Sequence, residues 1–274
     1  MSLGLVTMFL PRMELDFLGD WIAYHRAIGF SRFFLYDNGH VSIDPVFGKG
    51  KTDQVWHKKP EANYHLELSD EEVDRRLAEV LGSFGEAVEY RKWIPGTGHG
   101  NNFRTCQMSA VHHALARQQK AKDVDWLGHL DIDELLVCGR PSLVEMLGRL
   151  DLNVHSVRIR QKLFESRWRD GKSKRYSELS KSFGIQRFNP KLLVRVSTSS
   201  GWRGPHSLRN CPGKTWYPSP NLLRFHHFRG TGHFGSSPPK HWGIQKYLRR
   251  RLAVIQMDDS HSEFCVRAAT PSDQ

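Results

Sequence analysis

The pattern of apolar and polar residues changes its period along the first forty positions. Residues 3–10 form an unbroken apolar run, which is typical of a buried parallel strand. Between residues 14 and 28 the apolar side chains recur at helical spacing, and Gly29 follows as a natural helix end. Residues 30–36 form a second apolar run, halted by the turn signal Asp37-Asn38-Gly39. The order strand, helix, strand predicts a parallel sheet with crossover helices.

The same alternation continues through the middle of the chain and weakens beyond residue 151. Capping boxes at residues 69–72 and 142–145 each open a helix. Further strands are expected at residues 87–94, 126–130, 154–160, 192–196 and 222–226, and further helices after residue 102 and at residues 240–257. We therefore predict an α/β fold, with a mostly parallel sheet flanked by helices and a more irregular, basic C-terminal part.

Composition and charge narrow the class of protein. A chain of 274 residues, 39% of them hydrophobic, suits one α/β domain, and disorder is not expected over most of it. Residues 1–154 carry 17 Lys and Arg against 22 Asp and Glu, whereas residues 155–274 carry 23 against 7. The cationic half favours an anionic partner: a nucleotide diphosphate, an acidic glycan, a phospholipid surface or nucleic acid. A basic solvated surface is the simpler alternative.

The cysteines and the apolar runs exclude several classes. The four cysteines are widely and irregularly spaced without a CxxC pair, so neither a zinc site nor a disulfide framework is indicated. No run reaches the roughly 20 apolar residues that span a bilayer, and no basic segment precedes residues 3–10 as in a signal peptide. We therefore expect a cytoplasmic protein. The run Arg249-Arg250-Arg251 leaves peripheral contact with an anionic membrane open, although a solvated helix face explains it equally simply.

The most informative segment is the strand expected at residues 126–130, which runs into Asp131-Ile132-Asp133-Glu134. It delivers three carboxylates at the carboxyl end of a strand, the edge at which open α/β sheets bind ligands. In an extended backbone Asp131 and Asp133 point to the same side and repel each other unless a cation or hydrogen bonds hold them. Mg²⁺ or Mn²⁺, completed by a diphosphate, meets that need. Alternatively, these acids cap the next helix or pair with Lys and Arg.

Several short segments, spread over roughly residues 3–230, follow one another in a specific order and spacing. They are Arg12-Met13-Glu14, Asp20-Trp21-Ile22, Tyr24-His25, Ile28-Gly29, Leu35-Tyr36-Asp37-Asn38-Gly39, Gln107, Trp126, Asp131-Ile132-Asp133-Glu134-Leu135, Lys191, Val194-Arg195 and Gly204-Pro205-His206. This order resembles the family 2-like and family 92-like glycosyltransferases, once called domain of unknown function 23. The departures from the family pattern are Met13 for Asn, Asp20 for Glu, Gly39 for Ser and Leu135 for Phe. None of these departures removes a metal carboxylate, but Met13 and Gly39 bear on base and donor preference.

The resemblance implies a GT-A, Rossmann-like fold and transfer of a sugar, with inversion, from a nucleotide-sugar donor to a hydroxyl of a glycan or other acceptor. It implies Mn²⁺ or Mg²⁺ as cofactor and a UDP-linked donor. Residues 1–154 would form the donor-binding half with the DxD motif. Residues 155–257 would form the acceptor-binding half of the same catalytic domain, and residues 258–274 a tail.

The resemblance also implies roles for the residues that bind the donor. Asp133 would be the main metal ligand, with Asp131 and His206 as further ligands. Asp37, Glu14 and Asp131 would bind the nucleotide. Each has a plainer interpretation: Asp37 caps a turn, Glu14 is an acid favoured in the first turn of a helix, and His206 is structural.

Inverting transfer also needs a general base and cationic help for the leaving diphosphate. Few acids follow the motif, and we favour Glu165 over Asp170 and Glu178 because it directly follows an apolar, strand-like run. Lys191 and Arg195 are the candidates for the diphosphate. The alternatives are a surface ion pair for Glu165 and a solvated surface for the two cations. Catalytic, acceptor-binding and structural roles stay open for His226-His227.

Three other functions compete with this hypothesis. The basic half suggests a nucleic-acid-binding protein, but its basic residues are scattered and match no known module, so no specific nucleic acid is expected. A different phosphoryl or nucleotidyl transferase is disfavoured because the chain has no Walker-type phosphate loop. An inactive glycosyltransferase-like binding protein is the third alternative, against which the intact acidic segment argues.

Overall fold

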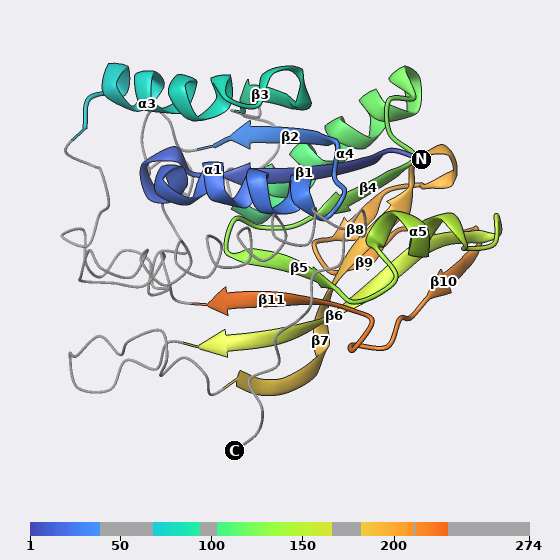
Figure 1. Ribbon diagram of the computed structural model, residues 1–274. Coiled ribbons are helices and arrows are strands. Elements are labelled where there is room, and N and C mark those ends of the chain that lie inside the picture. Colours follow the sequence, from blue (N-terminus) through green and yellow to red (C-terminus); the bar gives the residue numbers. More distant parts are fainter. Residues whose placement is uncertain (39–67, 94–102, 166–181, 211, 230–274) are drawn as a thin grey trace, which may run out of the picture.

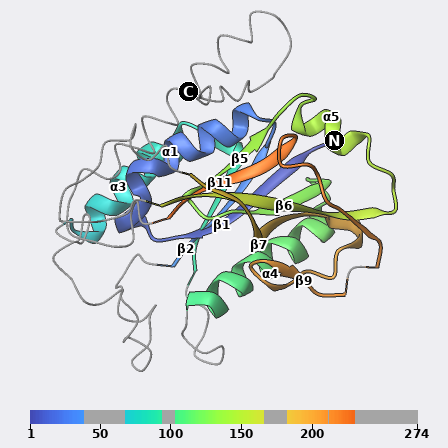
Figure 2. The ribbon, with the colours of Figure 1, turned by 90° about the horizontal axis from the view of Figure 1, so that it is seen from below.

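A curled mixed β-sheet runs through the centre of the protein, with helices on both of its faces (Figures 1 and 2). The computed structural model describes residues 1–38, 68–93, 103–165, 182–210 and 212–229. Its elements in chain order are β1 (Leu3–Phe9), α1 (Pro11–Ala27), β2 (Arg32–Asp37), α3 (Asp70–Gly82), β3 (Val88–Lys92), α4 (Phe103–Ala121), β4 (Trp126–His129), β5 (Glu134–Cys138), α5 (Leu143–Gly148), β6 (Val154–Glu165), β7 (Ser182–Arg195), β8 (Trp202–Gly204), β9 (Ser207–Leu208), β10 (Lys214–Trp216) and β11 (Leu223–Arg229).

The strand order of the sheet is β3-β2-β1-β4-β7-β6-β11-β5, and β10 pairs with β6 beside this path. The first four strands are parallel to one another, as the strand–helix–strand pattern predicts. β7 runs antiparallel to both β4 and β6, and β11 runs antiparallel to β5. The sheet is therefore mixed, because β7 and β5 run against its other strands.

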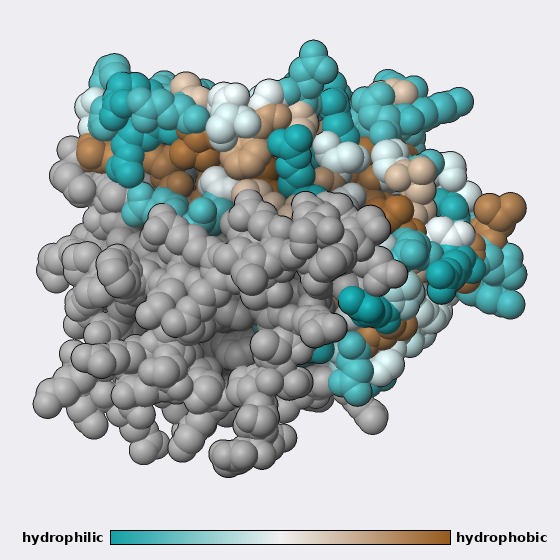
Figure 3. Space-filling view, viewed as in Figure 1, coloured by the Kyte–Doolittle hydropathy of each residue, from teal (hydrophilic) through white to brown (hydrophobic). Residues whose placement is uncertain are grey.

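Each face of the sheet carries its own apolar core, which explains why the strands are continuous hydrophobic runs. On one face, Leu5, Phe33 and Leu35 pack with residues of α1, α3 and α5. On the other face, Val6 and Phe34 pack with residues of α4 and of the segment around β8. Side chains alternate between the faces along β1 and β2, so both faces need a covering layer. In the space-filling view, hydrophilic residues lie along the top of the molecule, and hydrophobic residues show between and beneath them (Figure 3).

Local signals explain where several helices begin and end. Pro11 occupies the first turn of α1, where its missing N–H costs nothing, and Gly29 follows the helix with a φ of +111°. Ser69 caps α3 by accepting a hydrogen bond from the backbone N–H of Glu72. Ser142 and Glu145 form a complete capping box at α5. The end of α1 and the starts of α3 and α5 agree with those expected from the sequence, whereas α1 begins earlier than expected, at Pro11.

The predicted α/β class, with a sheet flanked by helices, is confirmed. The strand expected at residues 87–94 is shorter, because a 3-10 turn at Gly85–Ala87 precedes it. The helix expected at residues 240–257, its Arg249-Arg250-Arg251 run and the tail lie outside the described residues. Among the helices that the structure describes, none is long and apolar enough to cross a membrane.

His25 lies in the core below β5 and predicts a dependence of stability on pH. Its Nδ1 donates to the carbonyl of Trp21 (2.9 Å), and its Nε2 accepts from the N–H of Leu136 (3.3 Å). Burial lowers the pKa of His25 from 6.5 to about 3. The unfolded chain therefore binds the extra proton first, so this stability is present above pH 6.5 and is lost as the pH falls from there towards 3.

Between about pH 7.5 and about pH 5.5, His25 should account for a loss of about 1.4 kcal/mol of unfolding free energy. Urea unfolding of the wild type and of His25→Gln at both pH values measures this loss. The variant should lose about 1.4 kcal/mol less than the wild type over that interval. An identical pH dependence in both proteins would contradict the assignment.

Candidate functional site

The carboxyl ends of β1, β2 and β4 lie at one edge of the sheet, because these strands are parallel neighbours. The chain leaves β4 at this edge and enters the acidic segment of Asp131, Asp133 and Glu134. β11 returns to the same place from far along the sequence, and its register sets His227 directly opposite Glu134. Ligands of open α/β sheets bind at such an edge, and polar side chains from several strands gather there.

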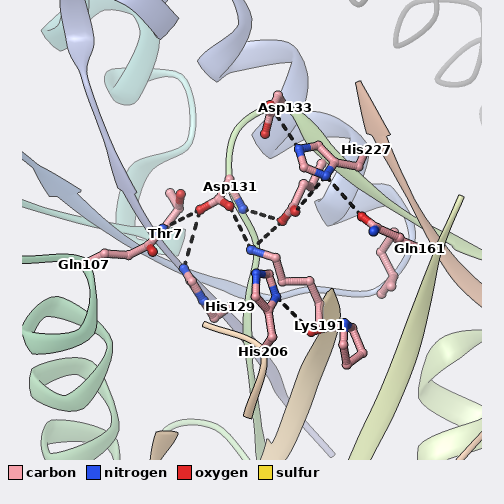
Figure 4. A network of polar contacts seen from close by, with 12 residues as sticks. Thr7, Gln107, His129, Asp131, Asp133, Gln161, Lys191, His206 and His227 are labelled. Atoms are coloured by element: carbon pink, nitrogen blue, oxygen red, sulfur yellow. Dashed lines mark hydrogen bonds and ion pairs between the residues drawn. The ribbon is translucent and has the colours of Figure 1, made fainter. Parts of the chain in front are cut away.

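The side chains of Asp131 and Glu134 share one buried cation, the ammonium of Lys191 (Figure 4). Lys191 Nζ lies 2.8 Å from Asp131 Oδ2 and 2.7 Å from Glu134 Oε2. The other oxygen of Asp131 accepts a hydrogen bond of 2.6 Å from the amide of Gln107, on α4. Glu134 Oε2 also accepts from the backbone N–H of Asp131 at 2.9 Å. The segment is thus held from three sides by donors of the chain itself.

The ionisation of these groups follows from their burial and their partners. Burial would raise the pKa of Asp131, but the Lys191 ammonium outweighs it and holds this pKa below its usual range. Burial raises the pKa of Glu134, and the nearby charge of Asp131 adds to this effect. Burial would lower the pKa of Lys191, but the two carboxylates raise it above its ordinary value. Lys191 is therefore charged at neutral pH.

Asp133 faces a different partner, the imidazole of His227 on β11. Its Oδ2 lies 3.4 Å from His227 Nε2, and the two side chains are 15% and 19% exposed. On the other side of the ring, Nδ1 meets the amide oxygen of the buried Gln161 at 3.2 Å. Burial would lower the pKa of His227, but the Asp133 carboxylate raises it to about 9. Gln161 and Asp133 together hold the ring with Nε2 towards the acidic segment.

Two further imidazoles lie beside Lys191. His206 contacts the carbonyl of Pro190 through Nδ1 at 3.2 Å, and burial, aided by the charge of Lys191, lowers its pKa to about 4. His129, at the end of β4, is buried, and its Nε2 lies 3.6 Å from Asp131 Oδ1. Burial, again aided by Lys191, lowers its pKa to about 3. Both rings are therefore neutral at physiological pH, which is the form that can ligate a metal.

Glu14 and Asp37 mark the neighbouring strand ends at the same edge. Glu14 is buried and accepts a hydrogen bond of 2.8 Å from the N–H of Leu10. Burial, together with the charges of Asp133 and Asp131, raises the pKa of Glu14. Asp37 is the last residue of β2 and accepts a hydrogen bond of 2.6 Å from Tyr90 Oη. The electrostatic effect of the acidic segment on Glu14 indicates that Glu14 lies near that segment, and Asp37 lies opposite Phe9 at the end of the neighbouring strand β1.

One of the residues expected from the sequence lies elsewhere, and the side chain of another is outside the described residues. Arg195 is opposite Trp126 at the start of β4, and its guanidinium lies 4.7 Å from the centre of that indole ring. It donates to the carbonyl oxygens of Val154 and Asp151, so the structure does not bring it to the acidic segment at the far end of β4. Glu165 ends β6 at the same edge as His227, but its side chain lies outside the described residues.

Sequence reasoning missed the role of Gln161 and left that of His227 open. The signal for His227 was its place at the end of a strand with an adjacent histidine. Because side chains alternate along β11, only one of the pair can face Glu134. The register selects His227, whereas His226 contacts Arg224. No signal in the sequence singled out Gln161, since its contact with His227 joins two strands 66 residues apart.

The residues at this edge fit a divalent cation only in part. Among the described residues, no three His, Cys, Asp or Glu side chains converge closely enough to hold a metal on their own. Asp133 Oδ2 and His227 Nε2, 3.4 Å apart, are nevertheless suited as a pair. Two ligands of an octahedral cation, each at roughly 2.1 Å from it, lie about 3 Å apart. The remaining positions of such a cation would fall to water or to phosphate oxygens.

No family model matches the chain, and no curated protein sequence matches it. Solved structures do. Glucosyl-3-phosphoglycerate synthase from Mycobacterium tuberculosis, in complex with Mn²⁺, UDP and glucosyl-3-phosphoglycerate, is 13% identical over 94% of this chain and 79% of its own, with a TM-score of 0.36. TarS from S. aureus, residues 1–349, is 11% identical over 94% and 66%, with a TM-score of 0.42. The galactosyltransferase LgtC, with donor and acceptor sugar analogs, is 13% identical over 92% and 95%, with a TM-score of 0.37.

These structural neighbours are glycosyltransferases, at low sequence identity. The narrower family 2-like or family 92-like assignment stays a prediction, because no family model matches. At TM-scores between 0.36 and 0.42, none of the likenesses locates a ligand or a catalytic residue in this chain. The function of this chain is therefore inferred from the side chains at the carboxyl edge of its sheet.

Proposed function

We propose that the protein is a metal-dependent glycosyltransferase with a nucleotide-sugar donor, of the GT-A type. The observation that carries this proposal is the pair Asp133 and His227, which faces the carboxyl edge of a parallel sheet. A carboxylate and an imidazole at 3.4 Å provide two ligands for Mn²⁺ or Mg²⁺, once the cation displaces the proton that Asp133 holds on the ring of His227. They leave the other coordination positions for a diphosphate, which is the ligand class that this edge binds in open α/β sheets.

Different residues at this edge would bind different parts of the donor. Asp133 and His227 would hold the metal, whose chemistry is to neutralise the negative charge of a leaving diphosphate. Asp131 is a third exposed although both its oxygens have donors, so it can still accept a ribose hydroxyl. Asp37, oriented by Tyr90, would bind the base or ribose, and Glu14 would shape the loop after β1. UDP is the nucleotide that we expect.

The general base and the stereochemistry belong to the proposal as well. Glu165 ends β6 at the edge that holds His227, so it stays the candidate base for a hydroxyl of a glycan acceptor, with inversion at the sugar. Lys191 is engaged by two carboxylates and is not placed to approach a diphosphate. His206 stays a further candidate for the metal, because the carbonyl of Pro190 engages its Nδ1 and leaves Nε2 on a ring that is neutral at physiological pH.

One observation favours a second candidate, an inactive binding protein. Lys191 and His227 already neutralise much of the acidic segment, so a nucleotide could bind there without any metal. The two candidates differ in one requirement. A transferase of the proposed kind needs the divalent cation to bind its nucleotide tightly, whereas the inactive protein binds the nucleotide equally well in a chelator.

Thermal unfolding with a panel of nucleoside diphosphates, in Mn²⁺ and in EDTA, tests the proposal. We expect stabilisation by UDP that requires Mn²⁺, of about 2.7 kcal/mol at 100 times the dissociation constant. Release of UDP from a UDP-sugar on addition of acceptor glycans then tests transfer itself. Equal stabilisation in EDTA would favour the inactive protein. Stabilisation by no nucleotide at all would remove the proposal, and steeply salt-dependent oligonucleotide binding would favour a nucleic-acid-binding protein instead.

A further inference from the structure

Lys191 lies inside the protein with its charged end between two carboxylates. Its side chain is 1% exposed, as is that of Glu134, and its Nζ is within 2.8 Å of both Asp131 and Glu134. An ammonium group is tolerated at such depth only when it is paired and hydrogen-bonded. The contact of Lys191 with the two carboxylates is therefore part of the packed interior of the site, unlike an ion pair on the surface.

The pairing of β7 with β4 brings Lys191 to the acidic segment. β7 is antiparallel to β4 and pairs with it through Leu193 and Gly128, so Lys191 lies just beyond the end of β4, where the acidic segment begins. The side chain of Leu193 fills the space beside Gly128, because a Cβ on Gly128 would lie 2.5 Å from Leu193 Cδ2. Gln107 holds the other oxygen of Asp131 from the opposite side of the sheet. Asp131 and Glu134 are thus oriented by donors of the chain, without a ligand.

We propose that Lys191 is a built-in cation that holds Asp131 and Glu134 in place and leaves Asp133 as the carboxylate of this segment that ligates a divalent metal. Three carboxylates lie within four consecutive residues, and Lys191 pairs with two of them, Asp131 and Glu134. Asp133 faces His227 instead, and this pair is left for a divalent metal. Lys191 is a positioning residue in this assignment, and the part that concerns the metal rests on the proposed function.

The first test removes the built-in cation and supplies another. Lys191→Ala deletes three methylene groups and the ammonium, which propylammonium can restore, and leaves two buried carboxylates uncompensated. We expect the variant to unfold at a lower temperature than the wild type. Mn²⁺ alone, or propylammonium, at millimolar concentration should then raise its midpoint by about 4 °C or more beyond the shift that the same additive gives the wild type.

The matched controls separate charge from packing. Lys120→Ala, at an exposed position of α4, should behave as the wild type with every additive. Lys191→Arg should need no added cation, because it keeps the charge. If Lys191→Ala does not fold, the triple variant Lys191→Met, Asp131→Asn, Glu134→Gln replaces it, because this variant removes all three charges together. A triple variant that folds, and whose unfolding temperature added cations do not raise beyond their effect on the wild type, supports the proposal. An unfolded one, or equal cation shifts in Lys191→Ala and the wild type, overturns it.

The second test asks which carboxylate ligates the metal. In Mn²⁺ and UDP, Asp131→Asn should weaken nucleotide binding by no more than about tenfold, whereas Asp133→Asn should weaken it by about a hundredfold or more. Equal losses in the two variants overturn the assignment of the ligand. Since the Lys191→Ala test contains no nucleotide, its outcome stands whether or not the protein transfers a sugar. Failure of UDP to bind the wild type would instead count against the proposed function.

Discussion

Replacing Asp133 with asparagine should remove the Mn²⁺-dependent stabilisation of the protein by UDP. Asp133 pairs with His227 at the carboxyl edge of the sheet and supplies the negative oxygen of the proposed metal site. Asparagine keeps the shape of the side chain but offers only a neutral carbonyl, which binds a divalent cation far more weakly. If binding weakens a hundredfold, the stabilisation at 100 times the wild-type dissociation constant falls from about 2.7 to about 0.4 kcal/mol.

The measurement is thermal unfolding of both proteins over a titration of UDP at constant Mn²⁺. Asp123→Asn is the matched control, because Asp123 is a half-exposed acid whose recorded ion pair with Arg32 is long, at 3.9 Å. It should bind UDP as tightly as the wild type. A normal UDP shift in Asp133→Asn would show that Asp133 does not ligate the metal. A normal shift in the variant and in EDTA alike would move the protein to the inactive class.

Replacing Trp21 with alanine should cost about 3–5 kcal/mol of unfolding free energy. The indole is fully buried between α1 and the sheet, with His25 at 4.5 Å and Phe33 at 6.1 Å between ring centres. Its Nε1 donates to the backbone carbonyl of Glu134 at 2.9 Å, which ties the acidic segment to the core. The truncation therefore leaves both a cavity and an unpaired buried carbonyl.

Urea unfolding of the wild type and of the variant measures this loss. The slope of the unfolding free energy against urea concentration should be the same in both proteins. Trp21→Phe fills most of the space but cannot donate, so it should cost about 1–3 kcal/mol. Tyr217→Ala is the control, since Tyr217 is 57% exposed and its removal should change stability by less than about 0.5 kcal/mol. A loss in Trp21→Ala no larger than that of the control would contradict the packing described for α1.

Much of the first half of the fold could be predicted from the sequence. The apolar runs of β1 and β2 and the helical spacing of α1 are local patterns, and the handedness of crossover connections makes such strands parallel neighbours. The acidic segment after β4 could likewise be predicted at the ligand-binding edge, because the carboxyl ends of parallel strands coincide. The mixed second half of the sheet could not, since the direction of β7 depends on which neighbours it pairs with.

The candidate site likewise contains some residues that were evident from the sequence and others that were not. The carboxylates of Asp131, Asp133 and Glu134 were evident from the sequence, because they are adjacent in the chain and follow an apolar strand. Their partners were not. Lys191 was expected to approach a diphosphate, yet it is buried against Asp131 and Glu134, and Arg195 was expected beside it, yet it packs on Trp126. The alternation of side chains along β7 and the register of β7 against β4 determine where Lys191 and Arg195 lie.

The sequence by itself therefore determined the class of fold, the position of the acidic segment and the need of its carboxylates for positive charge. Those properties follow from short-range periodicity and from the repulsion of neighbouring charges. Only the tertiary structure decided which cations meet that need. Lys191 and His227 are far from the acids in the sequence, 60 residues in the case of Lys191 and Asp131. They reach the acids through strand pairings, and the geometry of those pairings cannot be obtained from local pattern alone.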